Sequence, residues 1–447
     1  MTQTVITTDI TTDQLLKTIE GAYNYIQSKR IETEHGIRYS LEGSANSDPY
    51  FDDISLYSGA AGIIHFLLHY YEVTGNEQYL QDAEAAFSYI QYRWKEAREL
   101  SLAFSPWAFT TGYAGASFAV AELYKFTQKE VYKTFIEEVV DGIIADVKAS
   151  DDGIGGYWTG SFGILADSGI FLELLSLADQ FDRQDWRDFT LQTGRVLLNK
   201  GIDYKDGGRY FEGSSFGGKI IPGFPIGAGG VAYTLLKLYQ ASDDKAFLDA
   251  TAGVKDFYHA IYEYQDKTIT VPHDLPNEEN ENPVHYLGYC GGNAGLIRYL
   301  YEDYKVSKDD KNLSEIEQLI QSIVDLGAPE EHSEGFWHTI AYCCGSAGFL
   351  NAFLSVYQVT GKDIYLDFAK RTAIQLVKDG DLNEENGQES IKWNEAYTRL
   401  EPDNISAPIG FYDGAAGVAS VLLQLYSLLE GDYKVSRIID DPFPSTY

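Results

Sequence analysis

Residues 59–71 read GAAGIIHFLLHYY, a Gly-x-x-Gly element followed at once by an apolar run. The run is hydrophobic on all sides, as expected of a helix that is packed all round. The element recurs seven times, with first glycines 48 to 69 residues apart, and this self-similarity predicts a repeat architecture. Its copies are Gly59–Gly62, Gly112–Gly115, Gly160–Gly163, Gly227–Gly230, Gly292–Gly295, Gly345–Gly348 and Gly414–Gly417.

An amphipathic helix is predicted after each apolar one. In residues 76–90 the apolar side chains share one face of a helix, and they are Tyr79, Leu80, Ala83, Phe87 and Ile90. An inner apolar helix and an outer amphipathic helix, repeated in this way, predict an all-α fold, an α/α toroid or double-layer barrel of seven helical hairpins. The terminal repeats are as apolar as the middle ones, so we expect the ring to close.

The pattern predicts a single toroid domain over residues 1–447, because no stretch is typical of a linker between domains. Three of the longer intervals between repeats hold Gly-rich or acidic inserts, near residues 201–225, 264–288 and 380–410. We expect these inserts to be loops along one rim of the ring, where binding sites tend to lie.

The composition excludes some classes of partner. The formal charge is −33, from 67 acidic and 34 basic residues, and a field of this sign repels nucleic acid and anionic membranes. The opening sequence MTQTVITTDITTDQLL lacks the features of a signal peptide, and no apolar run is long enough to span a bilayer. We therefore expect a cytoplasmic protein with no membrane span. Three cysteines are too few for a disulfide framework.

All three cysteines lie just before a Gly-x-x-Gly element, in consecutive repeats. In a ring these positions face a shared central opening, and they are Tyr57-Ser58, Thr110-Thr111, Trp158-Thr159, Pro225-Ile226, Cys290-Gly291, Cys343-Cys344 and Tyr412-Asp413. Neighbouring hairpins bring equivalent positions close together, so Cys290, Cys343 and Cys344 are predicted to bind one Zn²⁺ and to leave a fourth coordination position open. The alternative is that they are small buried side chains with no ligand.

At these residues the chain resembles the lanthionine synthetase C-like family. Tyr289-Cys-Gly-Gly-Asn-Ala-Gly295 is similar to the family's Trp-Cys-Tyr-Gly-x-Pro-Gly motif, and Cys343-Cys344-Gly345 is similar to its Cys-His-Gly motif in a Cys-Cys-Gly variant. Ser55–Gly62 resembles the first repeat of the cyclase domains in bifunctional lanthipeptide synthetases.

The resemblance implies a toroid with a zinc ion at its centre. The implied reaction is the addition of peptide cysteine thiols to dehydroalanine or dehydrobutyrine, which forms lanthionine and methyllanthionine thioether rings. The implied partners are a dehydrated precursor peptide and a separate dehydratase.

Two positions depart from the family pattern. The family's fourth repeat usually carries a His-Gly pair that handles the proton, whereas this chain has Ile226-Gly227. An arginine expected before the first zinc cysteine is replaced by Tyr286. The candidates for the missing acid–base group are Asp413, which could instead cap a helix, and His285 and His338, which could instead be loop or seam residues.

Three functions therefore remain open. The first is a stand-alone zinc-dependent lanthipeptide cyclase. The second is a cyclisation-deficient relative that serves as a peptide-binding or scaffold subunit of a modification complex. The third is a carbohydrate-active α/α-barrel enzyme, which needs a facing pair of acids, although the central positions offer only Asp413.

Overall fold

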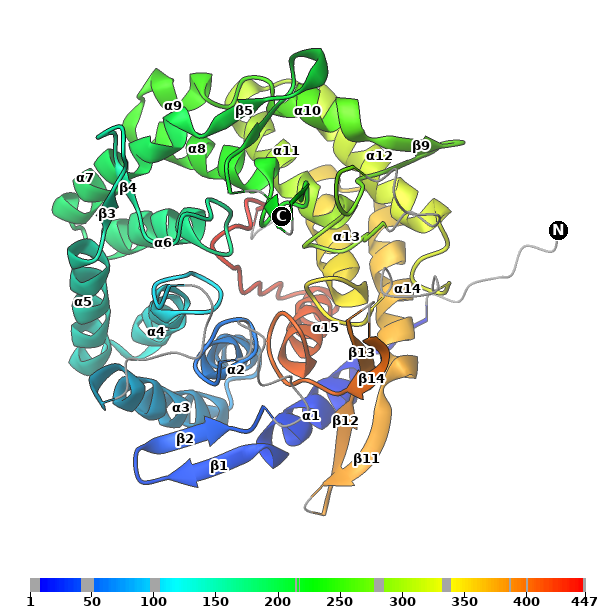
Figure 1. Cartoon of the computed structure of the whole chain (residues 1–447). Coiled ribbons are helices and arrows are strands. Elements are labelled where there is room, and N and C mark those ends of the chain that lie inside the picture. The colour runs from blue at the N-terminus through cyan, green and yellow to red at the C-terminus, as the bar shows by residue number, and fades with distance from the viewer. Residues whose placement is uncertain are drawn as a thin grey trace.

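Among the described residues, seven apolar helices stand side by side and form the inner wall of a ring (Figure 1). The computed structural model describes residues 9–41, 52–96, 105–213, 215–216, 218–276, 285–331, 339–385, 387–398 and 401–444. Each inner helix contacts the next one, and the last contacts the first, so the predicted ring closes. The inner helices are α2 (Ala60–Thr74), α4 (Tyr113–Thr127), α6 (Asp167–Gln180), α8 (Ala228–Ser242), α11 (Asn293–Ser307), α13 (Ser346–Thr360) and α15 (Ala415–Leu429).

The outer layer covers this wall with amphipathic helices, as predicted. The helices that follow an inner helix are α3 (Glu77–Glu96), α5 (Glu130–Ala145), α7 (Gln184–Thr193), α9 (Lys245–Asp249) with α10 (Val254–Ile261), α12 (Lys311–Asp325) and α14 (Asp363–Asp379). Short 3₁₀ segments, η1 (Gly194–Asn199) and η2 (Lys205–Gly207), follow α7. Within the described residues, no helix combines the length and the apolar character needed to cross a bilayer.

The outer partner of the seventh inner helix comes from the other end of the chain. Helix α1 (Thr12–Ser28) begins with a capping box between Thr11 and Gln14 and packs its apolar face against α15. The expectation that every outer helix follows its inner helix was therefore wrong for the last repeat. The contact between α1 and α15 joins the two ends of the chain within one hairpin.

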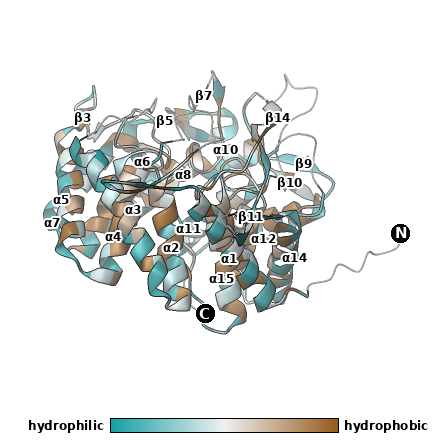
Figure 2. Cartoon of the chain, turned by 90° about the horizontal axis from the view of Figure 1, so that it is seen from below, coloured by the Kyte–Doolittle hydropathy of each residue, from teal (hydrophilic) through white to brown (hydrophobic). Residues whose placement is uncertain are grey.

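The inserts expected to be loops contain antiparallel β-hairpins. Figure 2 shows β5, β7 and β14 along the same edge of the helical ring. The paired strands are β1 (Arg30–Thr33) with β2 (Gly36–Tyr39), β3 (Lys148–Ala149) with β4 (Gly156–Tyr157), β5 (Gly201–Asp203) with β6 (Arg209–Phe211), β7 (Ser215–Phe216) with β8 (Lys219–Ile220), β9 (Glu263–Gln265) with β10 (Thr268–Thr270), β11 (Asp381–Glu385) with β12 (Gln388–Lys392), and β13 (Glu395–Thr398) with β14 (Glu401–Ser406).

In the first turn of the inner helix, the second glycine of the Gly-x-x-Gly element lies close to a backbone carbonyl oxygen of the preceding loop, which leaves no room for a side chain. A Cβ on Gly115 would lie 2.0 Å from the carbonyl oxygen of Phe109, and one on Gly295 would lie 1.9 Å from that of Tyr289. Real Cβ atoms do not tolerate such distances. The glycines therefore let each inner helix start directly against its own preceding loop.

The third repeat follows this geometry with a different sequence. Its inner helix begins at Asp167, after Ala166, and the glycine in its first turn is Gly169, whose Cβ would lie 2.2 Å from the Ile164 carbonyl oxygen. The assignment of Gly160–Gly163 to this role was wrong. An alanine stands where the other repeats have their first glycine, so the motif is not recognisable there from the sequence.

We predict that Gly115→Ala lowers the free energy of unfolding by about 3 kcal/mol, because the added methyl group overlaps backbone that cannot move freely. Gly75→Ala is a matched control, because Gly75 ends α2 with a φ of 69° and an added Cβ there meets no atom within 4 Å. The control substitution should lower the free energy of unfolding by only about 1 kcal/mol, because alanine is strained in the left-handed conformation. Urea unfolding of both variants measures the difference, and equal losses would contradict the steric explanation.

Candidate metal centre

The loops that precede the inner helices meet at the centre of the ring and are joined by a circular ladder of backbone hydrogen bonds. Each loop contributes one residue, whose N–H donates to the carbonyl oxygen of the corresponding residue in the next loop. The six described bonds are Tyr57 to Thr110 (2.9 Å), Thr110 to Leu165 (3.1 Å), Leu165 to Pro225 (3.2 Å), Cys290 to Cys343 (2.8 Å), Cys343 to Tyr412 (2.8 Å) and Tyr412 to Tyr57 (3.0 Å).

The ladder is interrupted between Pro225 and Cys290, because proline has no N–H to donate. The carbonyl oxygen of Cys290 instead faces Gly223, where an added Cβ would lie 2.0 Å away. The ladder residue of the third repeat is Leu165. Trp158, expected at this position, is buried elsewhere and donates its indole N–H to the Ile143 carbonyl oxygen at 2.7 Å.

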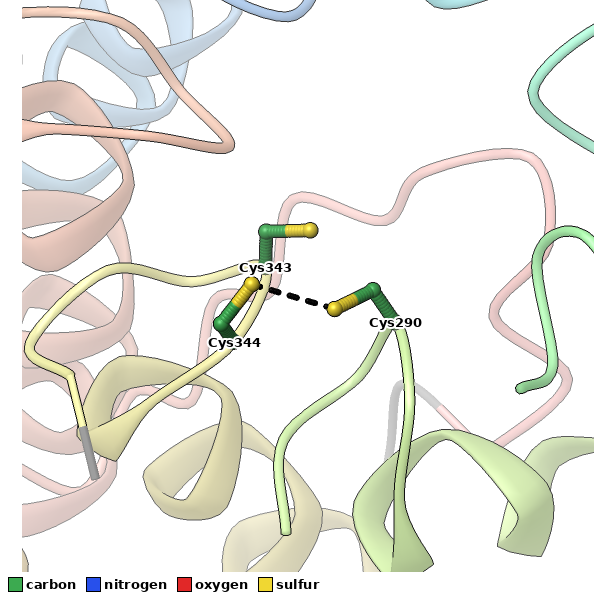
Figure 3. A group of neighbouring side chains, drawn as sticks. All are labelled: Cys290, Cys343 and Cys344. Atoms are coloured by element: carbon green, nitrogen blue, oxygen red, sulfur yellow. Dashed lines mark hydrogen bonds between the residues drawn. The ribbon is translucent and has the colours of Figure 1, made fainter. Parts of the chain in front are cut away.

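The ladder places the cysteines together, as predicted. Cys290 and Cys343 are adjacent ladder residues, and Cys344 follows directly (Figure 3). The three sulfur atoms lie within 4.8 Å of one another, and the Sγ atoms of Cys290 and Cys344 are 3.1 Å apart. All three are free thiols.

The donor set fits a tetrahedral metal ion. Three sulfurs at about 2.3 Å from one zinc ion would be separated by roughly 3.8 Å, a spacing that small side-chain adjustments reach from the observed one. The inner helices also begin at this level, so their partial positive ends favour thiolates here. These cysteines could hold a metal ion.

The protonation of the three thiols is strongly unequal. Hydrogen bonds from Cys290, Cys344 and the Tyr57 hydroxyl lower the pKa of Cys343 well below its usual range. The hydrogen bond with Cys343 raises the pKa of Cys290, and the hydrogen bond with Cys290 raises that of Cys344, with burial adding to both. These directions favour one thiolate, on Cys343, and make further negative charge costly, a cost that a bound cation would offset.

A buried polar cluster supports the cysteine loops from below, where the C-terminal segment crosses the centre of the ring (Figure 1). Asp440 is fully buried and accepts hydrogen bonds from Tyr289 and, at 3.1 Å, from Arg298. Arg298 also donates to the Tyr342 hydroxyl at 2.6 Å. Because Tyr289 and Tyr342 directly precede Cys290 and Cys343, this cluster fixes both loops.

The structure describes the surroundings of two of the three acid–base candidates. Asp413 is 8% exposed and accepts a hydrogen bond from the Ser58 hydroxyl at 2.5 Å, which ties the seventh repeat to the first. His285 contacts the carboxylate of Glu263 on β9, within the rim insert. His338 lies outside the described residues.

The two departures from the family pattern also lie near the centre. Ile226 follows the ladder residue Pro225 and is half-buried, and its side chain has no titratable group. Tyr286 is 7% exposed, and its ring packs edge-on against His273 with the centroids 4.4 Å apart.

A further carboxylate, which sequence reasoning missed, lies beside the cysteine loop. Glu395 begins β13, and its Oε2 accepts hydrogen bonds from the backbone N–H groups of Ile340 and Ala341, both at 3.3 Å. Burial and the charge of Asp413 raise the pKa of Glu395 to about 8. Nothing in the local sequence marks this glutamate, because its position depends on how the 380–410 insert folds back over the ring.

The chain is similar to a known protein family and to several solved structures. The family model described as lanthionine synthetase C-like protein matches residues 50–435. Nisin cyclase is similar in structure, with a TM-score of 0.61 and 14% identity over 94% of each chain. An α-mannanase of Bacteroides thetaiotaomicron has a TM-score of 0.47 and 11% identity over 93% of this chain and 96% of that chain. No curated protein sequence matches the chain.

At these identities the likeness to solved structures concerns the fold. A cellobiose 2-epimerase of Bacillus thermoamylovorans is also similar, with a TM-score of 0.45 and 12% identity over 73% of this chain and 90% of that chain. The match to nisin cyclase confirms the α/α toroid.

We predict that Tyr57→Phe moves the pH dependence of Cys343 alkylation by iodoacetamide to higher pH in metal-free protein. The Tyr57 hydroxyl donates a hydrogen bond that stabilises the Cys343 thiolate, so its loss should raise the pKa of Cys343. Tyr412→Phe is the control, because the buried Tyr412 hydroxyl has no hydrogen-bond partner among the described residues. Peptide mass spectrometry measures the alkylation rate at Cys343 over a series of pH values, and the same pH dependence in the two variants would contradict the assigned role of Tyr57.

Proposed function

This chain belongs to the lanthionine synthetase C-like family, and on that premise we propose that it is a zinc-dependent lanthipeptide cyclase. The reaction is the addition of peptide cysteine thiols to dehydroalanine or dehydrobutyrine, which forms lanthionine and methyllanthionine rings. The observation that carries the proposal is the group of three sulfur atoms, within 4.8 Å of one another, at the centre of the toroid.

The proposed ligands of the zinc ion are Cys290, Cys343 and Cys344. Zinc prefers tetrahedral sulfur and nitrogen ligands, and a catalytic site keeps one position open for the substrate. When bound there, zinc would keep a peptide thiol in its thiolate form near neutral pH. Three thiolate ligands leave the site with net negative charge, which favours a more nucleophilic substrate sulfur than a site with a neutral histidine ligand.

The chain's own residues supply the rigidity that the addition requires. The backbone ladder fixes Cys290 and Cys343 relative to each other, and Arg298 with Asp440 holds the preceding tyrosines. The Tyr57 hydroxyl stabilises negative charge on Cys343. A site held in this way loses little free energy to reorganisation when the substrate thiol arrives.

The proposed partners follow from this chemistry. The substrate is a dehydrated precursor peptide, and its dehydroamino acids are the product of a separate dehydratase. A chain with a formal charge of −33 tolerates a neutral or cationic peptide better than an acidic one.

The scaffold hypothesis is motivated by Ile226, which occupies the place of the family's proton-handling histidine. It predicts zinc occupancy and peptide binding without ring formation, so an activity measurement separates it from the cyclase hypothesis.

The carbohydrate hypothesis needs two acids that face a sugar. Asp413 and Glu395 instead accept hydrogen bonds from Ser58 and from the cysteine loop, which favours the cyclase.

We predict that the purified protein binds about one zinc ion per chain and that Cys290→Ala, Cys343→Ala and Cys344→Ala each weaken zinc binding by at least about 100-fold, because each removes a ligand. Thr110→Ala is the control, since Thr110 is a ladder residue far from the cysteines along the ring and keeps its backbone bonds. Elemental analysis after dialysis measures the zinc content. Full zinc content in all three cysteine variants would contradict the assigned ligands.

We predict that the zinc-loaded protein consumes the free thiols of a dehydrated precursor peptide. Ring formation does not change the peptide mass, so thiols are counted by alkylation and mass spectrometry. The same peptide without protein, and with the Cys290→Ala variant, gives the background rate. Thiol loss no faster than this background, with zinc bound, would reject the cyclase and favour the scaffold hypothesis.

A further inference from the structure

Thioether formation requires a proton at the α-carbon of the former dehydroamino acid. The position where the family usually carries histidine holds Ile226, which cannot supply that proton. A side chain that donates this proton would have to lie elsewhere at the centre of the ring, close to the cysteines and able to hold a proton near neutral pH.

Glu395 meets the geometric requirement because the 380–410 insert is anchored to the ring on both sides of it. Trp393 is 3% exposed and donates its indole N–H to the Leu376 carbonyl oxygen of α14 at 2.8 Å. Glu395 itself pairs with Ser406 across β13 and β14, which leads back to the loop of the seventh repeat. Figure 1 shows this hairpin drawn over the part of the ring that holds α14 and α15.

The glutamate is bound directly to the cysteine loop. Its Oε2 accepts the N–H groups of Ile340 and Ala341, and Ala341 lies two residues before Cys343. The residue as a whole is half-buried. These contacts place the carboxyl group beside the loop that carries Cys343 and Cys344.

The surroundings of Glu395 favour its neutral form. Burial contributes most, and the negative charges of Asp413 and Cys343 add to it, whereas the two backbone N–H groups oppose it. The balance raises the pKa of Glu395 to about 8, so a large fraction of this residue carries a proton at neutral pH. A carboxylic acid with such a pKa is well matched to general acid catalysis.

We propose that Glu395 is the proton donor of the cyclisation and takes the place of the family's histidine; this inference rests on the proposed cyclase function. The carbon–sulfur bond forms at the β-carbon, and the π electrons of the double bond move onto the α-carbon and its carbonyl group. The O–H bond of Glu395 then breaks and a C–H bond forms at the α-carbon. The carboxylate regains a proton from solvent, which balances the proton that the substrate thiol lost, so the net change is the addition of S–H across the double bond.

The test compares Glu395→Gln with Glu384→Gln in zinc-loaded protein. Glutamine can still accept the two backbone hydrogen bonds through its amide oxygen, so the cysteine loop should keep its conformation. Glu384 is an exposed residue of the same insert and serves as the matched control. We expect Glu395→Gln to lower the cyclisation rate by about 100-fold or more, the usual contribution of a general acid, with zinc content and peptide affinity unchanged.

Two further readouts distinguish proton donation from a structural role. The new α-carbon stereocentre should form as one diastereomer in wild type and as a mixture in Glu395→Gln, because solvent can protonate either face; chiral analysis of the hydrolysed peptide measures this. In the infrared difference between wild type and each variant at pH 7, a carbonyl stretch of a protonated carboxylic acid should be lost in Glu395→Gln and unchanged in Glu384→Gln.

The outcomes separate this inference from the function on which it rests. A wild-type protein that forms no rings rejects the proposed function itself. A wild-type protein that cyclises, with a Glu395→Gln variant equally fast and equally stereoselective, rejects only the role of Glu395. Loss of zinc together with activity in Glu395→Gln would show that the residue merely supports the loop, and it would also overturn the inference.

Discussion

The backbone ladder at the centre of the ring is the interaction on which the rest of the structure depends. Its six described hydrogen bonds connect loops that are about 50 to 70 residues apart in sequence, and they connect the seventh repeat back to the first. Each such bond contributes a net of about 1 kcal/mol, so the set is comparable to the whole stability of a typical domain. A ring that did not close would lose the bond from Tyr412 to Tyr57, which joins the seventh repeat to the first.

The ladder also explains where a metal ion can bind. It fixes adjacent ladder residues close together, so cysteines in two consecutive repeats are brought within bonding range of one ion. The gap at Pro225 lies beside Cys290, where Gly223 allows a close backbone approach in place of a hydrogen bond. The N-termini of the inner helices carry partial positive charge, which stabilises thiolates here. The buried contact between Arg298 and Asp440 holds the loops that carry the thiols.

Two carboxyl groups, those of Asp413 and Glu395, sit on the same framework. Asp413 is held by Ser58 from the neighbouring repeat, and its charge helps to keep Glu395 neutral. Glu395 in turn accepts the N–H groups of the loop that carries Cys343. The charges of Asp413 and Cys343 therefore both favour the neutral form of Glu395.

The sequence by itself determined the repeat, the two helical layers, the closure of the ring and the meeting of the three cysteines. These features follow from the sequence pattern of each repeat. In a closed ring of such repeats, corresponding residues of successive repeats become neighbours. Only the tertiary structure decided that Leu165 replaces Trp158 in the ladder, that α1 completes the last hairpin, and that Glu395 reaches the cysteine loop. Each of these depends on contacts between segments that differ from the repeat or lie far apart in the chain, and no local pattern encodes such contacts.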